Sequence, residues 1–140
     1  MSFRQPVDLD AINAHARGSL VENLGIVITE AGTDWLRGTM PVDARTVQPY
    51  GILHGGASVA LAETLGSIAG NLCVDPSKQR VVGLEINANH LRAMSHGTVT
   101  GTARALHIGR STQVWEIRIE NDAGQPVCIS RLTLAVVAVA

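Results

Sequence analysis

The sequence predicts an α+β domain in which an antiparallel sheet of about six strands wraps around one long central helix. Two observations support this prediction. Only one segment, His54–Cys73, is long enough for a long helix and apolar on almost every side. Most of the remaining chain consists of short apolar or alternating runs between turn residues, which is typical of strands. A helix without a polar stripe needs cover on most sides, and a curved sheet provides it.

Length and composition fit a single domain spanning residues 1–140. Hydrophobic residues make up 46% of the chain, with only one Phe, one Tyr and two Trp, so the core is expected to be aliphatic. The net charge is −1 without any run of Lys or Arg, which argues against a nucleic-acid partner. Cys73 and Cys128 lack CxxC spacing, and neither a signal peptide nor a membrane span is visible. We therefore expect two buried free thiols in a cytoplasmic protein.

The chain before the long helix predicts a short helix and then a hairpin. Asp8–Ser19 carries apolar residues at helical spacing. Ile26–Glu30 and Trp35–Pro41 are expected to be two strands around the turn Ala31–Asp34. The region Val42–Gly51 is expected to be a loop that leads into the long helix.

The long helix is expected over His54–Cys73, and the rest of the chain predicts strands. In one of these strands, apolar and charged side chains alternate from Trp115 to Glu120, so one face should meet the core and the other solvent. Short turns separate the four predicted strands, which are Arg80–Arg92, Gly97–His107, Arg110–Glu120 and Gln125–Val139.

A carboxylate in the middle of this helix requires an explanation. Glu63 stands among Gly, Ala, Leu and Ser residues. Burial of an unpaired charge costs free energy, so the position indicates either acid–base chemistry or a structural ion pair with a buried Arg or Lys. Ser67 follows one turn later on the same face. It could position a water molecule or simply cap a buried helix face.

The start of the helix offers a second candidate group. His54, Gly55 and Gly56 place free backbone N–H groups at the positive end of the helix dipole, where glycine lets a ligand approach. Such donors can hold the oxyanion that forms when a carbonyl is attacked. The two glycines could equally make only a tight turn. Gln48 in the preceding loop is a possible further donor to the same carbonyl.

Helix geometry separates these two candidate groups. Gly55 and Glu63 are eight residues apart, or about 12 Å along the helix axis. One carbonyl cannot touch both groups of the same helix at about 3 Å. If both act on one substrate, they come from different subunits with antiparallel helices, which a two-fold dimer supplies.

Other site types fit the sequence poorly. The segment Gly56–Ala60 is one glycine short of a GxSxG nucleophile elbow. The five histidines show neither an HExxH motif nor paired Cys/His spacing, and no GxGxxG or GxxxxGK[ST] occurs. We therefore expect no metal and no cofactor.

The loop and helix closely resemble those of the hotdog-fold acyl-CoA thioesterases. The motif is HGG followed by AxAE, with a Gln upstream, and it lies within Gln48–Ser67. The similarity extends over nearly the whole chain, through Met40–Asp43, Val82–His90, Leu106–Arg110 and Gln113–Ile117. Within the family, the chain is similar to the branch of the Arthrobacter-type 4-hydroxybenzoyl-CoA thioesterase. There it resembles the enterobactin proofreading and 1,4-dihydroxy-2-naphthoyl-CoA thioesterases.

The resemblance implies hydrolysis of an acyl- or aroyl-CoA, or of an acyl or aryl carrier-protein thioester, to the free acid and thiol. It implies that Glu63 is the nucleophile or general base and that the Gly55 N–H polarises the carbonyl. Gln48, His54 and Ser67 would assist. Coenzyme A would be part of the substrate, bound across a subunit interface in a homotetramer built as a dimer of dimers.

By position, the resemblance also implies a set of residues that contact the substrate or CoA. Arg92 and Arg110 suit nucleotide phosphates, although both could be solvated strand ends. Leu91 departs from the smaller or more polar residue of many relatives. The full set is Val82, Asn89, His90, Leu91, Arg92, Leu106, His107, Ile108, Gly109, Arg110 and Ser111.

Two other functions remain open on the sequence. A hotdog-type enoyl-thioester hydratase or dehydratase acts on the carbon chain and needs a His with an Asp or Glu, for which only His54 and Glu63 are candidates. A non-catalytic acyl-CoA binder is the other alternative. It has no need of a buried carboxylate beside a carbonyl, so Glu63 argues against it.

Overall fold

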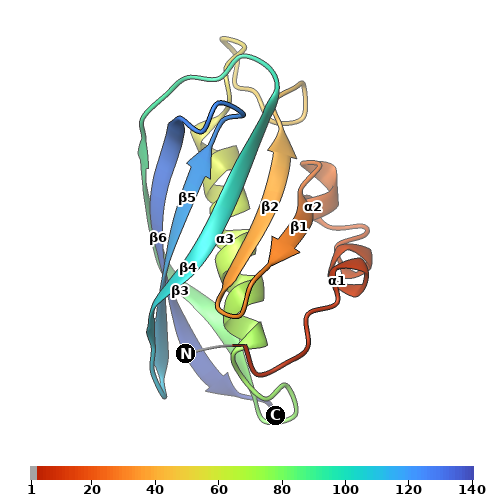
Figure 1. Ribbon diagram of the computed structural model, residues 1–140, viewed down its shortest axis with the longest axis vertical. Helices are drawn as coiled ribbons and strands as arrows, with labels where there is room; N and C mark the ends of the chain where they lie inside the picture. The colour runs from red at the N-terminus through yellow and green to blue at the C-terminus, as the bar shows by residue number, and fades with distance from the viewer. Residues whose placement is uncertain (1–2) are drawn as a thin grey trace.

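A computed structural model of the protein describes residues 3–140 and has the hotdog arrangement of a sheet around a helix (Figure 1). The six strands form one antiparallel sheet in the order β1-β2-β4-β5-β6-β3. Each predicted strand is found, with ends that differ by no more than two residues. The elements are α1 (Leu9–His15), α2 (Leu20–Asn23), β1 (Val27–Ala31), β2 (Trp35–Pro41), α3 (Gly55–Leu72), β3 (Gln79–His90), β4 (Thr98–Ile108), β5 (Thr112–Glu120) and β6 (Pro126–Ala138).

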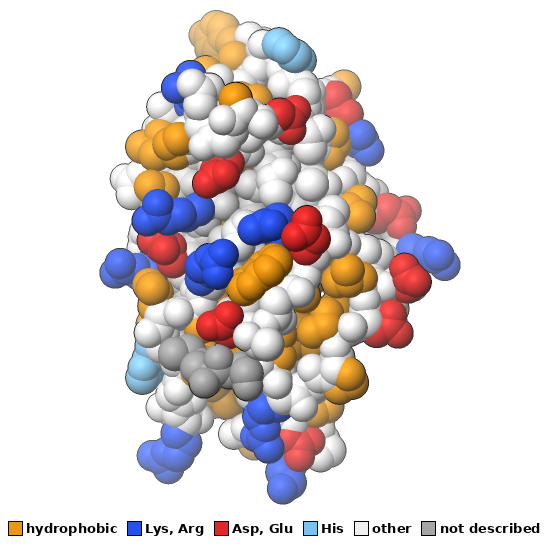
Figure 2. All heavy atoms as spheres, viewed as in Figure 1, with side chains coloured by type: hydrophobic (Ala, Val, Ile, Leu, Met, Phe, Trp, Pro, Cys, Tyr) orange, Lys and Arg blue, Asp and Glu red, His pale blue; other side chains and the backbone are white. Residues whose placement is uncertain are grey.

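The predicted alternation on β5 is confirmed. Trp115, Ile117 and Ile119 are fully buried against α3, whereas Arg118 and Glu120 are exposed. Figure 2 shows the outer face of the sheet, where acidic and basic side chains are interspersed. Ion pairs between neighbouring side chains, such as Arg118 with Glu116 at 3.4 Å, account for part of this pattern. The sheet therefore has one dry and one wet face.

Two glycines on α3 allow the helix to approach the sheet closely. A Cβ atom added to Gly66 would lie 2.5 Å from Leu132 Cδ2, and one added to Gly70 would lie 2.6 Å from Leu134 Cδ1. Both leucines belong to β6 and are fully buried. Larger side chains at these two positions would push α3 away from the sheet and open the core.

The cover of α3 differs from the prediction. The sheet buries one side of the helix, but Glu63, Thr64, Ser67 and Ile68 are only half-buried. The reason is that short helices, α1 and α2, stand beside this side of α3 instead of further strands (Figure 1). We call the half-buried row Glu63, Thr64, Ser67 and Ile68 the open stripe of α3. Small residues are compatible both with close packing against the sheet and with partial exposure, so the sequence does not show which side of the helix is open.

The predicted helix over Asp8–Ser19 is wrong in its extent. Asp8 caps α1, but the helix ends at His15, and Gly18 then takes a left-handed conformation with φ of 75°. Ser19 caps the separate helix α2 by accepting a hydrogen bond from Val21 N at 3.2 Å. A left-handed glycine is a common helix terminator, which explains the break.

Helix α1 is fixed to the outer edge of the sheet through one amide side chain. Asn13 Nδ2 donates to the Ile28 carbonyl of β1 at 2.9 Å, and Asn13 Oδ1 accepts from the Ile28 N–H at 2.9 Å. The side chain thus makes the two hydrogen bonds that a neighbouring strand would make. At the other edge of the sheet, β6 is the one strand paired with β3 in the described part of the chain, residues 3–140.

Both cysteines are buried and free, as predicted. Burial raises the pKa of the Cys73 thiol to about 11 and also raises the pKa of Cys128. Both groups therefore remain protonated and weakly nucleophilic at neutral pH. No group of three or more His, Cys, Asp or Glu side chains within residues 3–140 is arranged to hold a metal ion. In the same part of the chain, every helix is too short or too polar to cross a membrane.

One buried polar side chain links the sheet to α3. Gln113 is fully buried on β5, where its Oε1 accepts a hydrogen bond from Trp115 Nε1 at 2.9 Å. Its Nε2 donates to the Gly70 carbonyl at 3.2 Å. The amide thus satisfies a buried indole N–H that has no access to water.

We expect Gln113→Leu to lower the free energy of unfolding by about 2 kcal/mol, because it leaves the buried Trp115 N–H without an acceptor. Urea denaturation followed by circular dichroism measures this change. The double variant Gln113→Leu/Trp115→Phe removes both polar partners and should cost less than the sum of the two single changes. Additive costs would contradict the proposed coupling.

Candidate active site

The first turn of α3 leaves one backbone donor free. His54 Nδ1 accepts a hydrogen bond from Gly56 N at 2.8 Å, and the His54 carbonyl accepts from Ala57 N and Ser58 N at 3.0 and 3.2 Å. The Gly55 N–H has no acceptor within residues 3–140. Because His54 Nδ1 accepts, the neutral imidazole carries its proton on Nε2. Two donors, Gly55 N–H and His54 Nε2–H, are therefore available at the start of the helix.

The structure places His90 beside this donor. A Cβ atom on Gly55 would lie 2.9 Å from His90 Nε2, so the imidazole packs directly against the glycine. His90 is the last residue of β3. The chain continues through Leu91, whose N–H donates to the Val127 carbonyl at 2.8 Å, to the exposed Arg92. The predicted ligand residues at this end of β3 thus lie close to Gly55.

Gln48 lies in a tight turn in front of α3. Its Oε1 accepts a hydrogen bond from Tyr50 N, and its carbonyl accepts from Gly51 N at 2.9 Å. Gly51 has a φ of 81°, which this turn requires. Since the Gln48 oxygen is engaged, its NH₂ group is the part available to a ligand. The His54 N–H donates to the Thr46 carbonyl at 2.8 Å, so the turn and the helix start are joined.

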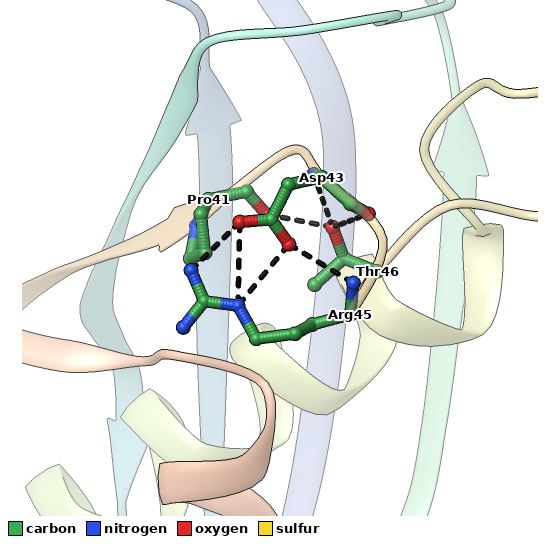
Figure 3. Close-up of polar contacts among 4 residues, drawn as sticks. All are labelled: Pro41, Asp43, Arg45 and Thr46. Carbon is green, nitrogen blue, oxygen red and sulfur yellow. Dashed lines mark hydrogen bonds and ion pairs between the residues drawn. The ribbon is translucent and has the colours of Figure 1, made fainter.

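A polar cluster anchors this loop to the end of β2 (Figure 3). Thr46 is buried, and its hydroxyl donates to the Pro41 carbonyl at 2.6 Å and accepts from Asp43 N at 3.2 Å. Arg45 Nη2 contacts the Asp43 carboxylate at 2.7 Å. Hydrogen bonds from Arg45 hold the pKa of Asp43 below its usual value. The cluster gives Gln48 and His54 a fixed support.

Glu63 lies on the open stripe of α3 and points towards β3. A Cβ atom on Gly83 would lie only 2.6 Å from Glu63 Oε2, so glycine at this position makes room for the carboxylate. The ion pairs found within residues 3–140 do not include Glu63, so the structural ion pair considered above is absent from this part of the chain. The expected burial of Glu63 is incomplete in a single chain, because the sheet does not cover this stripe.

Glu63 and Ser67 line one groove, as their spacing on the helix predicts. This α1–α3 groove has a volume of about 940 Å³ and lies between the open stripe of α3 and the segment that contains α1 and α2. Ile12 and Leu20 line it from the α1–α2 side. The groove places a hydrophobic surface beside the carboxylate.

The predicted ligand residues fall into two groups at opposite ends of β3. Val82 pairs with Ala135, which also pairs with Thr112, so Val82 lies near the turn formed by Leu106–Ser111. His90 and its predicted neighbours lie eight residues further along the same strand, or about 25 Å away. A single chain therefore does not bring the two groups together.

Two parts of this region are not among the residues predicted from the sequence. One is the wall formed by α1 and α2, which includes Ile12, His15 and Leu20. Their place in a groove depends on the packing of α1 against β1, for which the sequence carries no signal. The other is Gly83, next to which the β3–β6 register shifts. A glycine inside an apolar strand indicates a bulge or a close approach, so this signal was present.

Comparison with known proteins gives the family. The sequence matches the thioesterase superfamily over residues 50–128, which is more than half of the chain. It is 50% identical to the 1,4-dihydroxy-2-naphthoyl-CoA hydrolase of Escherichia coli, over 97% of this chain and 99% of that protein. It is 53% identical to the proofreading thioesterase EntH of Cronobacter sakazakii, over 97% and 98%.

A solved structure agrees with these sequence matches. A mutant of the thioesterase PA1618 from Pseudomonas aeruginosa superposes with a TM-score of 0.98 at 52% identity, covering 99% of this chain and 100% of that one. The antiparallel sheet and the central helix thus occur together in a solved structure that shares half of the sequence. The chain belongs to the thioesterase superfamily, and it is a thioester hydrolase with the hotdog fold.

Proposed function

We propose that the protein hydrolyses an acyl-CoA or carrier-protein thioester at a site built by two subunits, one supplying Glu63 and the other Gly55. The separation of these groups carries the proposal. Glu63 lies at Gly83, whereas Gly55 lies beside His90, seven residues further along β3. A carbonyl held by both groups within about 3 Å therefore needs a second chain.

The open edge of the sheet supports a two-fold partner. Among residues 3–140, β3 has no neighbour beyond β6, and its Val82 and Leu84 are 41% and 60% exposed. Pairing of β3 with β3 of a second copy would cover these apolar side chains and satisfy the edge. The resemblance extends this dimer to a tetramer, which we also propose. Free thiols support a cytoplasmic location.

Antiparallel pairing of β3 also accounts for the two groups of predicted ligand residues. It brings the Val82 end of one strand beside the His90 end of its partner. One CoA could then contact Leu106–Ser111 of one subunit and Asn89–Arg92 of the other. Arg92 and Arg110 are both exposed and would pair with its phosphates.

Two routes lead to the same products. In the first, a Glu63 oxygen attacks the thioester carbon, the C–S bond breaks, and water then cleaves the resulting anhydride. In the second, Glu63 takes a proton from water, and the water oxygen attacks directly. In both, water supplies the oxygen of the free acid and a proton of the thiol. The Gly55 N–H and the Gln48 amide of the partner would stabilise the oxyanion, while Ser67 would hold the water or the acyl group.

Thiol release tests the proposal. Wild-type protein is incubated with a panel of acyl-CoA, aroyl-CoA and aryl carrier-protein thioesters, and we expect free thiol from at least one class. A single turnover in ¹⁸O-water tests the first route, because water that attacks the Glu63 carbon of the anhydride leaves label in Glu63, which direct attack on the thioester never does. Consumption of an enoyl-CoA without thiol release would contradict hydrolysis.

A further inference from the structure

The sulfur of a thioester needs a proton when the C–S bond breaks. A carboxylate is a much weaker base than an alkanethiolate, so an intermediate formed by attack of Glu63 would expel Glu63 again in preference to the thiolate. A proton on the departing sulfur reverses this preference. In the anhydride route Glu63 is acylated at that moment and cannot supply the proton, so hydrolysis calls for an acid elsewhere in the site.

His54 is not suited to this task. Its Nδ1 accepts a hydrogen bond from Gly56 N at 2.8 Å, so the ring is neutral and carries its one proton on Nε2. Loss of that proton would leave an imidazolate anion, and protonation of Nδ1 would break the hydrogen bond to Gly56. His54 therefore donates a hydrogen bond whose proton it keeps.

His90 lies beside the Gly55 N–H with both ring nitrogens free. Its Nε2 is 2.9 Å from the position of a Cβ atom on Gly55, so it lies within about 4.5 Å of the Gly55 Cα once one C–C bond is added. The hydrogen bonds of histidine rings within residues 3–140 belong to His54 and His96. The His90 side chain is exposed, so solvent can deliver a proton to the ring.

The proposed path of the substrate passes this ring. A carbonyl oxygen bound by the Gly55 N–H lies about 3 Å from that nitrogen, and the sulfur is bonded to the same carbonyl carbon. The arm of CoA begins at the sulfur and would lead to Arg92, which is exposed two residues beyond the end of β3. The sulfur would therefore lie between Gly55 and Arg92, beside His90 Nε2.

We propose that His90, as an imidazolium ion, donates its Nε2 proton to the sulfur of the leaving thiol. This inference depends on the proposed function, because it requires the thioester carbonyl to lie at the Gly55 N–H. His90 then comes from the subunit that supplies Gly55, and Glu63 comes from the other.

Protons and charges balance in both routes. As the C–S bond breaks, its electron pair goes to the sulfur, the sulfur takes the Nε2 proton, and His90 becomes neutral. In the anhydride route, the water that cleaves the anhydride returns one proton to His90 and releases the other to solvent. In the direct route, the proton that Glu63 takes from water passes to His90 through solvent. Both side chains thus regain their starting charges.

Leaving groups of different acidity test this role. Thiol release is measured with one acyl group on three thiols that lack the nucleotide, namely 4-nitrothiophenol, thiophenol and N-acetylcysteamine. His90→Gln keeps a hydrogen-bond donor but has no transferable proton. We expect it to lower kcat/KM by about 10²-fold for the N-acetylcysteamine thioester, whose thiolate is the strongest base, and by less than about threefold for the 4-nitrothiophenyl thioester. Thiophenol should give an intermediate loss.

His96→Gln is the matched control, because His96 is an exposed histidine in the loop between β3 and β4. We expect wild-type kcat/KM from this control with all three thioesters. An equal loss on all three thioesters in His90→Gln would assign His90 to packing against Gly55 and overturn its role as an acid, as would the absence of any loss. Wild-type protein that releases no thiol from any thioester would overturn the proposed function as well.

Discussion

Replacement of Glu63 by Gln is expected to lower kcat for thioester hydrolysis by about 10³-fold. The amide has almost the shape of the carboxylate, but it neither attacks a carbonyl nor takes a proton from water. Glu63 is half-buried, and none of the ion pairs found within residues 3–140 includes it, so the fold should tolerate the change. The same loss is expected for both routes to the free acid.

Thiol release under saturating substrate measures this loss, and calorimetric titration with CoA shows whether binding survives. Glu120→Gln is the matched control, because Glu120 is exposed on the outer face of the sheet. We expect wild-type turnover from the control and unchanged CoA affinity in both variants. Turnover of Glu63→Gln within tenfold of wild type would refute the catalytic assignment of Glu63.

Two inactive variants are expected to regain activity when their subunits are mixed. Gly55→Val places a branched side chain against His90 and over the free N–H, so it should lower kcat by about 10²- to 10³-fold. Glu63→Gln disables the other half of the site. In a dimer of one chain of each kind, one site has both an intact Glu63 and an intact Gly55. An equal mixture should recover about one quarter of wild-type turnover, since half of the dimers are mixed and each has one intact site.

Co-expression of two differently tagged chains and tandem purification provides the mixed dimers for this test. The control pairs Glu63→Gln with the double variant Gly55→Val/Glu63→Gln, in which no chain carries Glu63. This control should stay inactive. Purified mixed dimers of the two single variants that remain inactive would show that Glu63 and Gly55 do not act across the interface.

The sequence predicts the parts of this fold that depend on local patterns. The alternation from Trp115 to Glu120 identifies β5, and the long apolar segment identifies α3, because both periodicities persist over many residues. The break between α1 and α2 also has local signals, because Gly18 is typical of a helix end and Ser19 of a new cap. The single helix predicted over Asp8–Ser19 does not take these two signals into account.

The strand order and the half-exposure of Glu63 could not be predicted from the sequence, because they depend on non-local packing. Nothing near β3 in the sequence places it beside β6 at an open edge, and nothing near Glu63 reveals which side of α3 the sheet covers. Gly83 indicates a bulge or a close approach from the sequence alone, but only the structure shows that the approaching group is the Glu63 carboxylate. The types of candidate residue were predictable, whereas their grouping around β3 required the structure.

The side chain of Asn13 has a consequence for how large an assembly this sheet can form. A sheet with two unprotected edges can add chains without limit, as fibrils do. Here the amide occupies the outward N–H and carbonyl of Ile28, so further strands cannot polymerise at β1 there. Growth is thus left to β3, where the two-fold pairing that we propose would be self-terminating. We expect loss of the Asn13 amide to leave the N–H and carbonyl of Ile28 free to pair with a strand of another chain.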